Sequence, residues 1–350
     1  MTGMQRRVTE FCERFGLRLP ILEAPMAGAC PPELAIAVAE AGGMGADGVV
    51  LDPPEQITAW VERFRAGSAG ALQLNIWIPD PPVDAPDRLR AAEDYLAGFG
   101  APGEPGPAGP VFAEQCEAML DAAPTVISSI MGLFEPDYVE RMHARGIAWF
   151  ACATTLEDAL AAQEAGADAI VAQGMEAGGH RGTFDPAAAE HTNVGLFALL
   201  PHLADRLRVP VVAAGGIADG RGVAAALALG ASAVQVGTAL LRSPEAGIDE
   251  TWASALAELP PERTVPTRAY SGRLGRAVPT EFVTGWARPE APAPAPYPHQ
   301  RRLVGQWRRG GATGVDRVNQ WAGQGAALAR QAPAGTIVQE MWETARALLA

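Results

Sequence analysis

The sequence contains no lysine, and this absence excludes several kinds of enzyme chemistry. Its 350 residues include 27 basic ones, all of them arginine, and 40 acidic ones, so the formal net charge is −13. Without lysine the chain has no residue for a Schiff base, for the phosphate-binding lysine of a P-loop, or for a lysine general base. The negative net charge argues against nucleic acid as a partner, because a phosphate polymer would be repelled on average.

Paired cysteines and long apolar runs are missing as well. The four cysteines, Cys12, Cys30, Cys116 and Cys152, lie far apart and form no Cys-x-x-Cys pair. Free thiols in a reducing cytoplasm are therefore expected instead of disulfides or a zinc site. The N-terminus lacks the apolar region of a signal peptide, and no uncharged apolar run is long enough to span a membrane. We expect a cytoplasmic monomer or homodimer that binds neither a metal nor a membrane.

What the sequence does contain is a regular alternation of short β-branched runs with alanine-rich helical runs between Pro20 and Leu241. This alternation predicts an α/β fold with a parallel sheet covered by helices. The number of repeats favours a (β/α)8 TIM barrel, although strand counting leaves a doubly wound sheet open. Strands are expected at residues 21–24, 44–50, 72–76, 125–128, 148–152, 169–172, 211–214 and 233–236. Helices are expected at residues 32–41, 54–65, 136–145, 155–165 and 220–229.

Two stretches fall outside this alternation. Residues 79–110 are rich in proline and glycine, which predicts an excursion above or beside the barrel. After Leu241 the pattern changes to a stiff, proline-rich connector at 286–298. Helical patterns lie at 251–258 and 315–330, and a final helix over 336–349 is expected to return to the barrel wall. We therefore expect residues 1–244 and 336–350 to form the barrel, and residues 245–335 to form a smaller, mostly helical substrate or lid domain.

Glycines follow the last two expected barrel strands. Gly215 and Gly216 come directly after residues 211–214, and Gly237 precedes Thr238 after residues 233–236. Glycine lets backbone N–H groups approach a ligand, and the N-terminus of a following helix adds positive potential. One such glycine usually only makes a tight turn. Two such loops, after what would be the seventh and eighth strands of a TIM barrel, favour a phosphate site.

The segment from Gln173 to Gly182, Gln-Gly-Met-Glu-Ala-Gly-Gly-His-Arg-Gly, is the densest in candidate chemistry. His180 has no apolar periodicity around it, so core packing explains it poorly. At the C-terminal end of a barrel strand, a histidine can act as a base or stabilise an anion. Gln173 can donate and accept hydrogen bonds, whereas Glu176 either orients the loop or faces solvent. The remaining histidines are expected to be structural: His143, His191, His202 and His299.

Small and amide side chains follow other strands. The segment from Pro25 to Gly28, Pro-Met-Ala-Gly, comes after the first strand, where small residues let a flat ring lie against the backbone. Gln73 and Asn75 share one face of their strand by alternation. Two amides that face a barrel interior need partners, and either a ligand or an internal network would provide them.

Taken together, these segments resemble the ordered motifs of the nitronate monooxygenases, formerly called 2-nitropropane dioxygenases. The resemblance covers about residues 20–241 and includes Ala-Pro-Met-Ala-Gly, the His180 segment, Gly-Gly-Ile followed by Gly-Arg-Gly, and Gln-Val-Gly-Thr. It implies a flavoprotein that uses FMN and O2 to oxidise alkyl nitronates, or nitroalkanes, to carbonyl compounds, with His180 as the catalytic base or anion stabiliser. The residues that it implies for FMN binding are Pro25, Met26, Ala27, Asn75, Gln173, Gly178, Gly179, Gly215, Gly216, Gln235, Val236, Gly237 and Thr238.

Other functions are open at this point. Some nitronate monooxygenases place a lysine near the flavin, and Arg273 and Arg276 are the candidates to replace it, although arginine and lysine are not equivalent. An FMN-dependent NAD(P)H reductase of enoyl thioesters or quinones is the nearest alternative, and the lack of a second Gly-x-Gly-x-x-Gly segment argues against it. A non-catalytic flavin-binding protein is another, and His180 argues against that.

Overall fold

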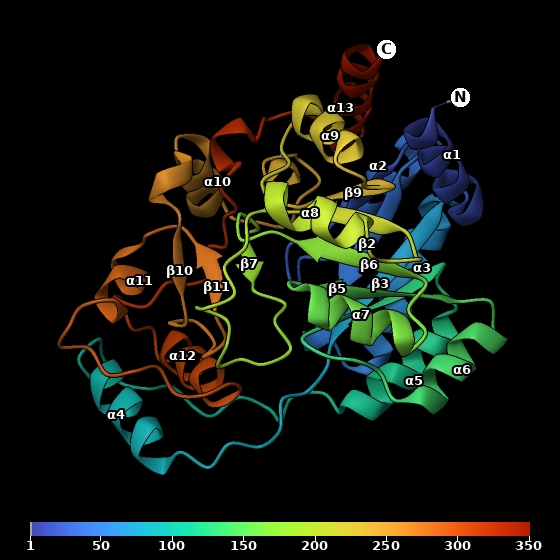
Figure 1. The fold of residues 1–350 in the computed structure, drawn as a ribbon. Coiled ribbons are helices and arrows are strands. Elements are labelled where there is room, and N and C mark those ends of the chain that lie inside the picture. Colours follow the sequence, from blue (N-terminus) through green and yellow to red (C-terminus); the bar gives the residue numbers. More distant parts are fainter. Residues whose placement is uncertain (1) are drawn as a thin grey trace.

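A closed barrel of eight parallel strands forms the centre of the computed structural model, which describes residues 2–350 (Figure 1). Neighbouring strands follow the order β1-β2-β3-β4-β5-β6-β8-β9, and pairing of β1 with β9 closes the ring. Closure excludes the doubly wound sheet, and all eight expected strands are present. They are β1 (Ile21–Glu23), β2 (Met44–Gly48), β3 (Ala71–Trp77), β4 (Val126–Ile130), β5 (Ala148–Ala153), β6 (Ala169–Gln173), β8 (Val211–Ala214) and β9 (Ala233–Val236).

Helices cover the outside of the barrel. None of the helices in residues 2–350 is both long and apolar enough to cross a membrane. The last helix, α13 (Ala334–Leu349), packs against α2 and α9, so the C-terminus returns to the barrel wall as predicted. The others around the barrel are α1 (Gly3–Phe15), α2 (Pro32–Ala41), α3 (Pro54–Gly67), α5 (Phe112–Ala122), α6 (Pro136–Ala144), α7 (Leu156–Glu164), α8 (Leu196–Ala204) and α9 (Gly220–Ala228).

Aromatic side chains close the N-terminal end of the barrel. Phe11 and Phe15 of α1 lie with their ring centroids 4.8 Å apart, and Phe15 lies edge-on to Phe150 inside the barrel at 5.0 Å. Outward-facing strand residues pack against the helices, so the strands are buried on both faces. Burial on both faces explains why the strands appear in the sequence as apolar runs without alternation. With this end filled, a ligand has room only at the C-terminal strand ends.

Residues 245–335 and the 79–110 excursion lie together beside the barrel (Figure 1). Their shared core joins Leu96 of the excursion to Tyr270, Phe282 and Trp307. A three-stranded sheet of order β10-β11-β7 connects this part to the barrel loops. The strands of this sheet are β7 (Gly179–His180), β10 (Val265–Thr267) and β11 (Gly275–Ala277). The helices beside the barrel are α4 (Pro86–Ala97), α10 (Glu250–Ala257), α11 (Glu281–Trp286) and α12 (His299–Arg309). Short 3₁₀ helices are η1 (Val49–Leu51), η2 (Thr238–Leu240), η3 (Pro261–Arg263) and η4 (Ala326–Leu328).

The prediction of a helix over residues 315–330 is wrong. Only η4 forms there, and an isolated β-bridge joins Trp321 to Ala277. A Cβ built on Gly323 would lie 2.9 Å from the amide nitrogen of Gly178, so the two backbones are in close contact. The amide of Ala322 also donates to a carbonyl of β11 instead of to its own segment. These long-range backbone contacts override the helical periodicity.

Packing of α9 on α13 depends on Gly220. A Cβ at this position would lie 2.4 Å from Cβ of Thr344 and 2.5 Å from the carbonyl oxygen of Met341. We expect Gly220→Ala to lower the free energy of unfolding by about 1–3 kcal/mol, because the two helices must move apart. Gly222→Ala is the matched control in the same helix, since its Cβ would meet Ile217 at an ordinary 3.4 Å. Urea denaturation measures both variants, and equal stabilities would contradict the packing argument.

Candidate active site

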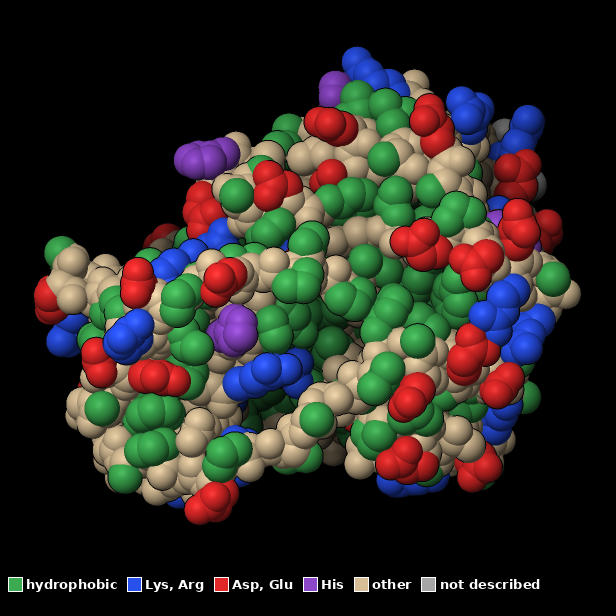
Figure 2. Space-filling model, turned by 90° about the horizontal axis from the view of Figure 1, so that it is seen from below, with side chains coloured by type: hydrophobic (Ala, Val, Ile, Leu, Met, Phe, Trp, Pro, Cys, Tyr) green, Lys and Arg blue, Asp and Glu red, His purple; other side chains and the backbone are tan. Residues whose placement is uncertain are grey.

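A cavity of about 230 Å³ opens at the C-terminal ends of all eight barrel strands. A single buried water needs about 15 Å³, so this space accommodates an organic ligand. Figure 2 shows one face of the molecule hollowed near its middle, with mainly hydrophobic side chains in the hollow. The predicted residues that line the cavity are Pro25, Met26, Ala27, Asn75, Gln173, Gly178, Gly179, His180, Gly215, Gly216, Gln235, Gly237 and Thr238.

Val236 is the predicted residue whose side chain lies elsewhere. It is fully buried in the layer between the barrel and the helices, whereas its neighbour Gln235 lines the cavity. Successive residues of a strand point to opposite faces, so both side chains cannot reach the barrel interior.

Free backbone donors gather where β8 and β9 end. No hydrogen bond within residues 2–350 uses the amides of Gly215, Gly216 or Gly237. Gly215 and Gly216 have φ values of +112° and +69°, and this left-handed conformation favours glycine. The hydroxyl of Thr238 accepts a bond of 3.0 Å from the amide of Gly323, so its own proton is left to donate. A concave group of donors of this kind suits a phosphate.

The N-terminus of α9 contributes less to this group than predicted. Asp219 caps α9, and its carboxylate accepts from the amides of Arg221 at 2.9 Å and Gly222 at 3.2 Å. The same carboxylate pairs with the Arg221 guanidinium. These amides are therefore occupied by a side chain of the helix itself. After β9 the chain forms η2, whose first residue, Thr238, lies on the cavity.

The side-chain amides of Gln73 and Asn75 in β3 form a hydrogen-bond network that leaves one acceptor oxygen without a partner. Gln73 Nε2 donates to Ser128 Oγ at 3.0 Å, and Asn75 Nδ2 donates to the same oxygen at 2.9 Å. Gln73 Oε1 is buried without a partner among the described residues. Buried polar atoms are rarely unpaired, so this oxygen calls for a hydrogen-bond donor from a ligand.

Gln173 and Glu176 both hold loops in place. Gln173 Nε2 donates to the carbonyl of His180 at 3.0 Å, and its Oε1 accepts from the amide of Gly182 at 2.8 Å. Although Gln173 lines the cavity, both ends of its amide therefore hold the His180 segment. The Glu176 carboxylate accepts from the amide of Leu196, the first residue of α8, at 2.9 Å. Of the two roles expected for Glu176, orienting the loop or facing solvent, this contact supports the first.

His180 is fixed from several directions. In the backbone, His180 of β7 lies opposite Gly275 of β11. In the side chain, Nε2 lies 2.7 Å from Ser271 Oγ. The ring centroids of Trp77 and Trp321 lie 4.4 and 4.5 Å from the imidazole, both edge-on. Residues from distant parts of the sequence thus hold the imidazole at the cavity.

The imidazole of His180 is neutral near pH 7. Burial lowers its pKa to about 3, and the positive charges of Arg273 and Arg301 act in the same direction. Ser271 Oγ lies 3.3 Å from the carbonyl oxygen of Arg273, to which it can donate. When it does so, it accepts the proton of Nε2 and leaves the lone pair of Nδ1 free. A neutral ring with a free lone pair can accept a proton.

The two candidates to replace a flavin-side lysine, Arg273 and Arg276, are engaged by other groups of the protein. Arg273 bonds to Asp80 and to the carbonyl of Thr183, and Arg276 bonds to the carbonyls of Met175 and Thr264. Neither lines the cavity; the arginine that does is Arg301 of α12, which the sequence argument missed. Further lining residues that it missed are Trp77, Ser128, Trp252, Ser271, Asn319 and Trp321.

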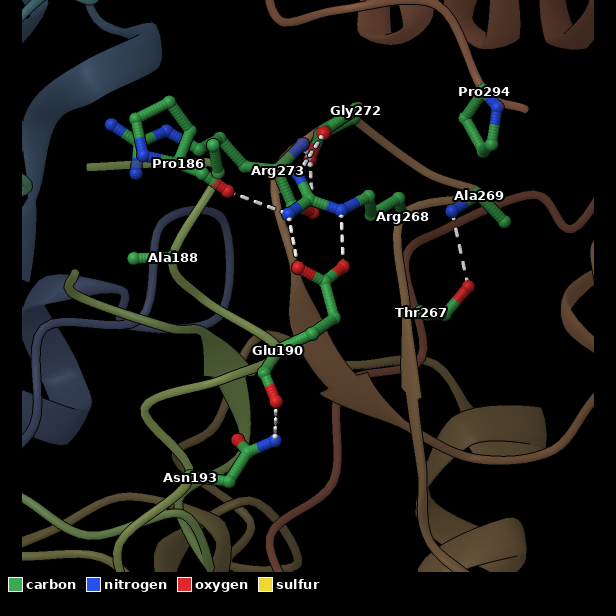
Figure 3. Close-up of polar contacts among 12 residues, drawn as sticks. Pro186, Ala188, Glu190, Asn193, Thr267, Arg268, Ala269, Gly272, Arg273 and Pro294 are labelled. Carbon is green, nitrogen blue, oxygen red and sulfur yellow. Dashed lines mark hydrogen bonds and ion pairs between the residues drawn. The ribbon is translucent and has the colours of Figure 1, made fainter. Parts of the chain in front are cut away.

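Two arginines anchor the turn that carries Ser271. Arg268 donates to both carboxylate oxygens of Glu190, at 2.6 and 2.8 Å, and to the carbonyl of Pro186, at 2.7 Å. Figure 3 shows these contacts. Arg273 pairs with Asp80 beyond the end of β3. Since Ser271 lies between the two arginines, both ion pairs help to keep its hydroxyl at His180.

Comparison with known proteins extends over nearly the whole chain. Residues 9–344 match the model of a family described as nitronate monooxygenase. A nitronate monooxygenase of Pseudomonas aeruginosa PAO1 is 39% identical over 96% of this chain and 99% of its own length. Another, from Paraburkholderia phytofirmans PsJN, is 38% identical over 93% and 92%. The crystal structure of a nitroalkane oxidase from Streptomyces ansochromogenes has a TM-score of 0.88 and 33% identity, over 97% of this chain and 99% of that one.

The two ion pairs differ in burial and therefore in expected effect. The side chains of Arg273 and Asp80 are 2% and 11% exposed, whereas those of Arg268 and Glu190 are 21% and 46% exposed. We expect Asp80→Asn to lower the free energy of unfolding by about 3–5 kcal/mol, because it leaves a buried charge unpaired. Glu190→Gln, the matched control, should cost less than about 1 kcal/mol. Equal losses in chemical denaturation would show that burial does not separate these pairs.

The lowered pKa of His180 also predicts a pH dependence of stability. Unfolded histidine binds a proton near pH 6.5, whereas the folded ring does so near pH 3. Protons therefore favour the unfolded state as the pH falls from about 7 towards 3. We expect the wild type to lose more stability than His180→Gln between pH 7.5 and 5, measured as the difference in Tm. Parallel curves for the two proteins would mean that the imidazole titrates normally in the fold.

Proposed function

Because the chain belongs to the nitronate monooxygenase family, we propose that it is an FMN-dependent enzyme that uses O2 to oxidise alkyl nitronates to carbonyl compounds. The observation that carries this proposal is the neutral imidazole of His180, fixed by Ser271 on the cavity that the free amides of Gly215 and Gly216 also line. We assign His180 as the catalytic residue.

The cavity fits FMN by the chemistry of its walls. The phosphate would lie on the amides of Gly215, Gly216 and Gly237 and on the Thr238 hydroxyl, all of which have donor capacity to spare. The small residues Pro25, Met26 and Ala27 would back the ring, with Gly178, Gly179, Asn75 and Gln235 beside it and the open Gln73 Oε1 as an acceptor. When bound, the flavin supplies the electron transfer between nitronate and O2, which no side chain here provides.

The protein's own part is proton transfer and substrate orientation. With a neutral nitroalkane, His180 would take the proton from the carbon that bears the nitro group. Ser271 keeps the ring in place, since its hydroxyl can accept a hydrogen bond from Nε2–H and donate its own to the carbonyl of Arg273. Trp77 and Trp321 lie edge-on to the imidazole and cover part of it. With a nitronate, which has already lost this proton, the neutral ring would orient the anion.

The barrel and residues 245–335 would contribute different groups to the site. In this proposal the barrel provides the phosphate and flavin contacts together with His180. Residues 245–335 act as the substrate or lid domain and contribute Ser271, Arg301, Asn319 and Trp321 to the cavity wall. The sheet of β7, β10 and β11 would fix the two parts together at the reacting centre.

Replacement of His180 tests this assignment. We expect His180→Asn to retain FMN but to lose turnover by about 100-fold or more, because positioned acid–base groups typically contribute that much. The loss should be larger with 1-nitropropane than with its nitronate, since only the former needs a proton removed. The flavin absorption band reports retention of the cofactor, and O2 uptake reports turnover.

His202→Asn, exposed on α8, is the control and should behave as wild type. Full activity of His180→Asn on every accepted substrate would remove the catalytic assignment. A wild type that ignores nitronates but oxidises NAD(P)H with a quinone or an enoyl thioester would instead be a reductase.

A further inference from the structure

A carboxyl group is buried behind the segment that would back the flavin ring. Glu23 is the last residue of β1 and is fully buried. Leu22 packs inside the barrel, so by strand alternation the Glu23 side chain points away from the cavity, towards the surrounding helices. Its Oε2 accepts a bond of 2.9 Å from the amide of Ala46, whereas its Oε1 has no partner among the described residues. Buried polar atoms are rarely unpaired, so this carboxyl calls for an explanation beyond stability.

A second buried carboxyl acts on the first, and no cation in residues 2–350 forms an ion pair with either of them. Asp47 of β2 accepts a bond of 2.8 Å at Oδ1 from the amide of Gly48. The titratable groups that act on Glu23 are the Cys30 thiol and Asp47, and Asp52 acts on Asp47. Burial raises the pKa of Glu23 to about 8 and that of Asp47 to about 7. Glu23 is therefore mainly protonated at pH 7 and mainly ionised at pH 9.

Cys30 connects this carboxyl to the cavity wall. Its Sγ accepts from the amide of Met26 at 3.3 Å and lies 3.5 Å from the carbonyl oxygen of Ala24, to which the thiol donates. These two contacts hold the turn of residues 24–30, of which residues 25–27 line the cavity. The thiol also lies beside the Glu23 carboxyl, since the two groups shift each other's pKa. The backbone of Cys30 is fixed separately, because Trp60 Nε1 donates to its carbonyl at 3.0 Å.

We propose that Glu23 is a positioning residue that holds the turn of residues 24–30 against the flavin while its carboxyl is protonated and loosens the turn when it ionises. This inference rests on the proposed function. The thiol of Cys30 has one proton for two acceptors, the Ala24 carbonyl and the Glu23 carboxyl. A carboxylate accepts a stronger hydrogen bond than a carbonyl because it carries a charge. Once Glu23 is ionised, the thiol therefore turns to it, and the Ala24 carbonyl loses its donor.

The affinity for FMN as a function of pH tests the proposal, measured by equilibrium dialysis of the apoprotein. We expect the Kd of the wild type to rise about 5- to 10-fold from pH 7 to pH 9, because FMN binds better to the form protonated at Glu23. Glu23→Gln keeps the shape but cannot ionise, so its Kd should change by less than about 2-fold. Asp47→Asn should keep the pH dependence but move its midpoint to lower pH, since the charge of Asp47 raises the pKa of Glu23. Glu33→Gln, exposed on α2, is the control and should follow the wild type.

Measurements on the protein without cofactor provide a second readout. Hydrogen-exchange protection of residues 24–30, corrected for the intrinsic rates, should fall from pH 7 to pH 9 in the wild type but not in Glu23→Gln. The infrared band of a protonated carboxyl should disappear from the wild type over the same range, which needs no variant. Equal pH dependence in the two proteins, or a wild type without this band at pH 7, overturns the proposal. If the protein binds FMN at no pH, the proposed function fails, while hydrogen exchange still decides whether Glu23 controls the turn.

Discussion

The ladder between β7 and β11 is the contact on which the candidate site depends. Gly275 lies opposite His180, and Arg276 lies opposite Gly179. β7 belongs to the loop that leaves barrel strand β6, whereas β11 belongs to residues 245–335. Two residue pairs therefore bind the histidine loop of the barrel to the rest of the molecule. The Ser271 turn precedes β11 and the Trp321 bridge joins its end, so the same ladder brings both residues to the imidazole.

The sign of the charge at the cavity differs from that of the chain as a whole. The chain carries a formal charge of −13, yet Arg301 and the free amides after β8 and β9 make the cavity attractive to anions. Burial lowers the pKa of His180 to about 3 and raises that of the Cys152 thiol, also on the wall, to about 12. Both groups are thus neutral at pH 7. The charge that an anionic substrate meets comes from arginine and the backbone, which do not titrate in this range.

The barrel could be predicted because its signals are local. Buried parallel strands produce apolar runs, and a glycine after residues 211–214 or 233–236 marks the cavity rim within one βα unit. The three short strands β7, β10 and β11 have no such signal, since Gly179 and His180 form a strand only because β11 lies beside them. The segment around Trp321 has helical periodicity, but its amides bond to β11 and its glycine packs on Gly178.

The arginine that lines the cavity could not be predicted for a similar reason. Arg273 and Arg276 are the candidates in the sequence because some nitronate monooxygenases place a lysine near the flavin. Only the three-dimensional structure shows that Asp80, about 190 positions earlier, already neutralises Arg273. Arg301 follows a proline-rich connector without a recognisable motif. Its one local signal is a cation in the first turn of a helix, where it is disfavoured.

An absorption spectrum of the purified protein, followed by anaerobic addition of an alkyl nitronate, tests the central claim most directly. We predict a bound-flavin spectrum that bleaches with the nitronate and recovers when air is admitted. No flavin, even after reconstitution with FMN, would contradict the assignment of the strand-end cavity as a flavin site. A flavin that ignores the nitronate and bleaches with NAD(P)H would contradict the assignment of the reaction.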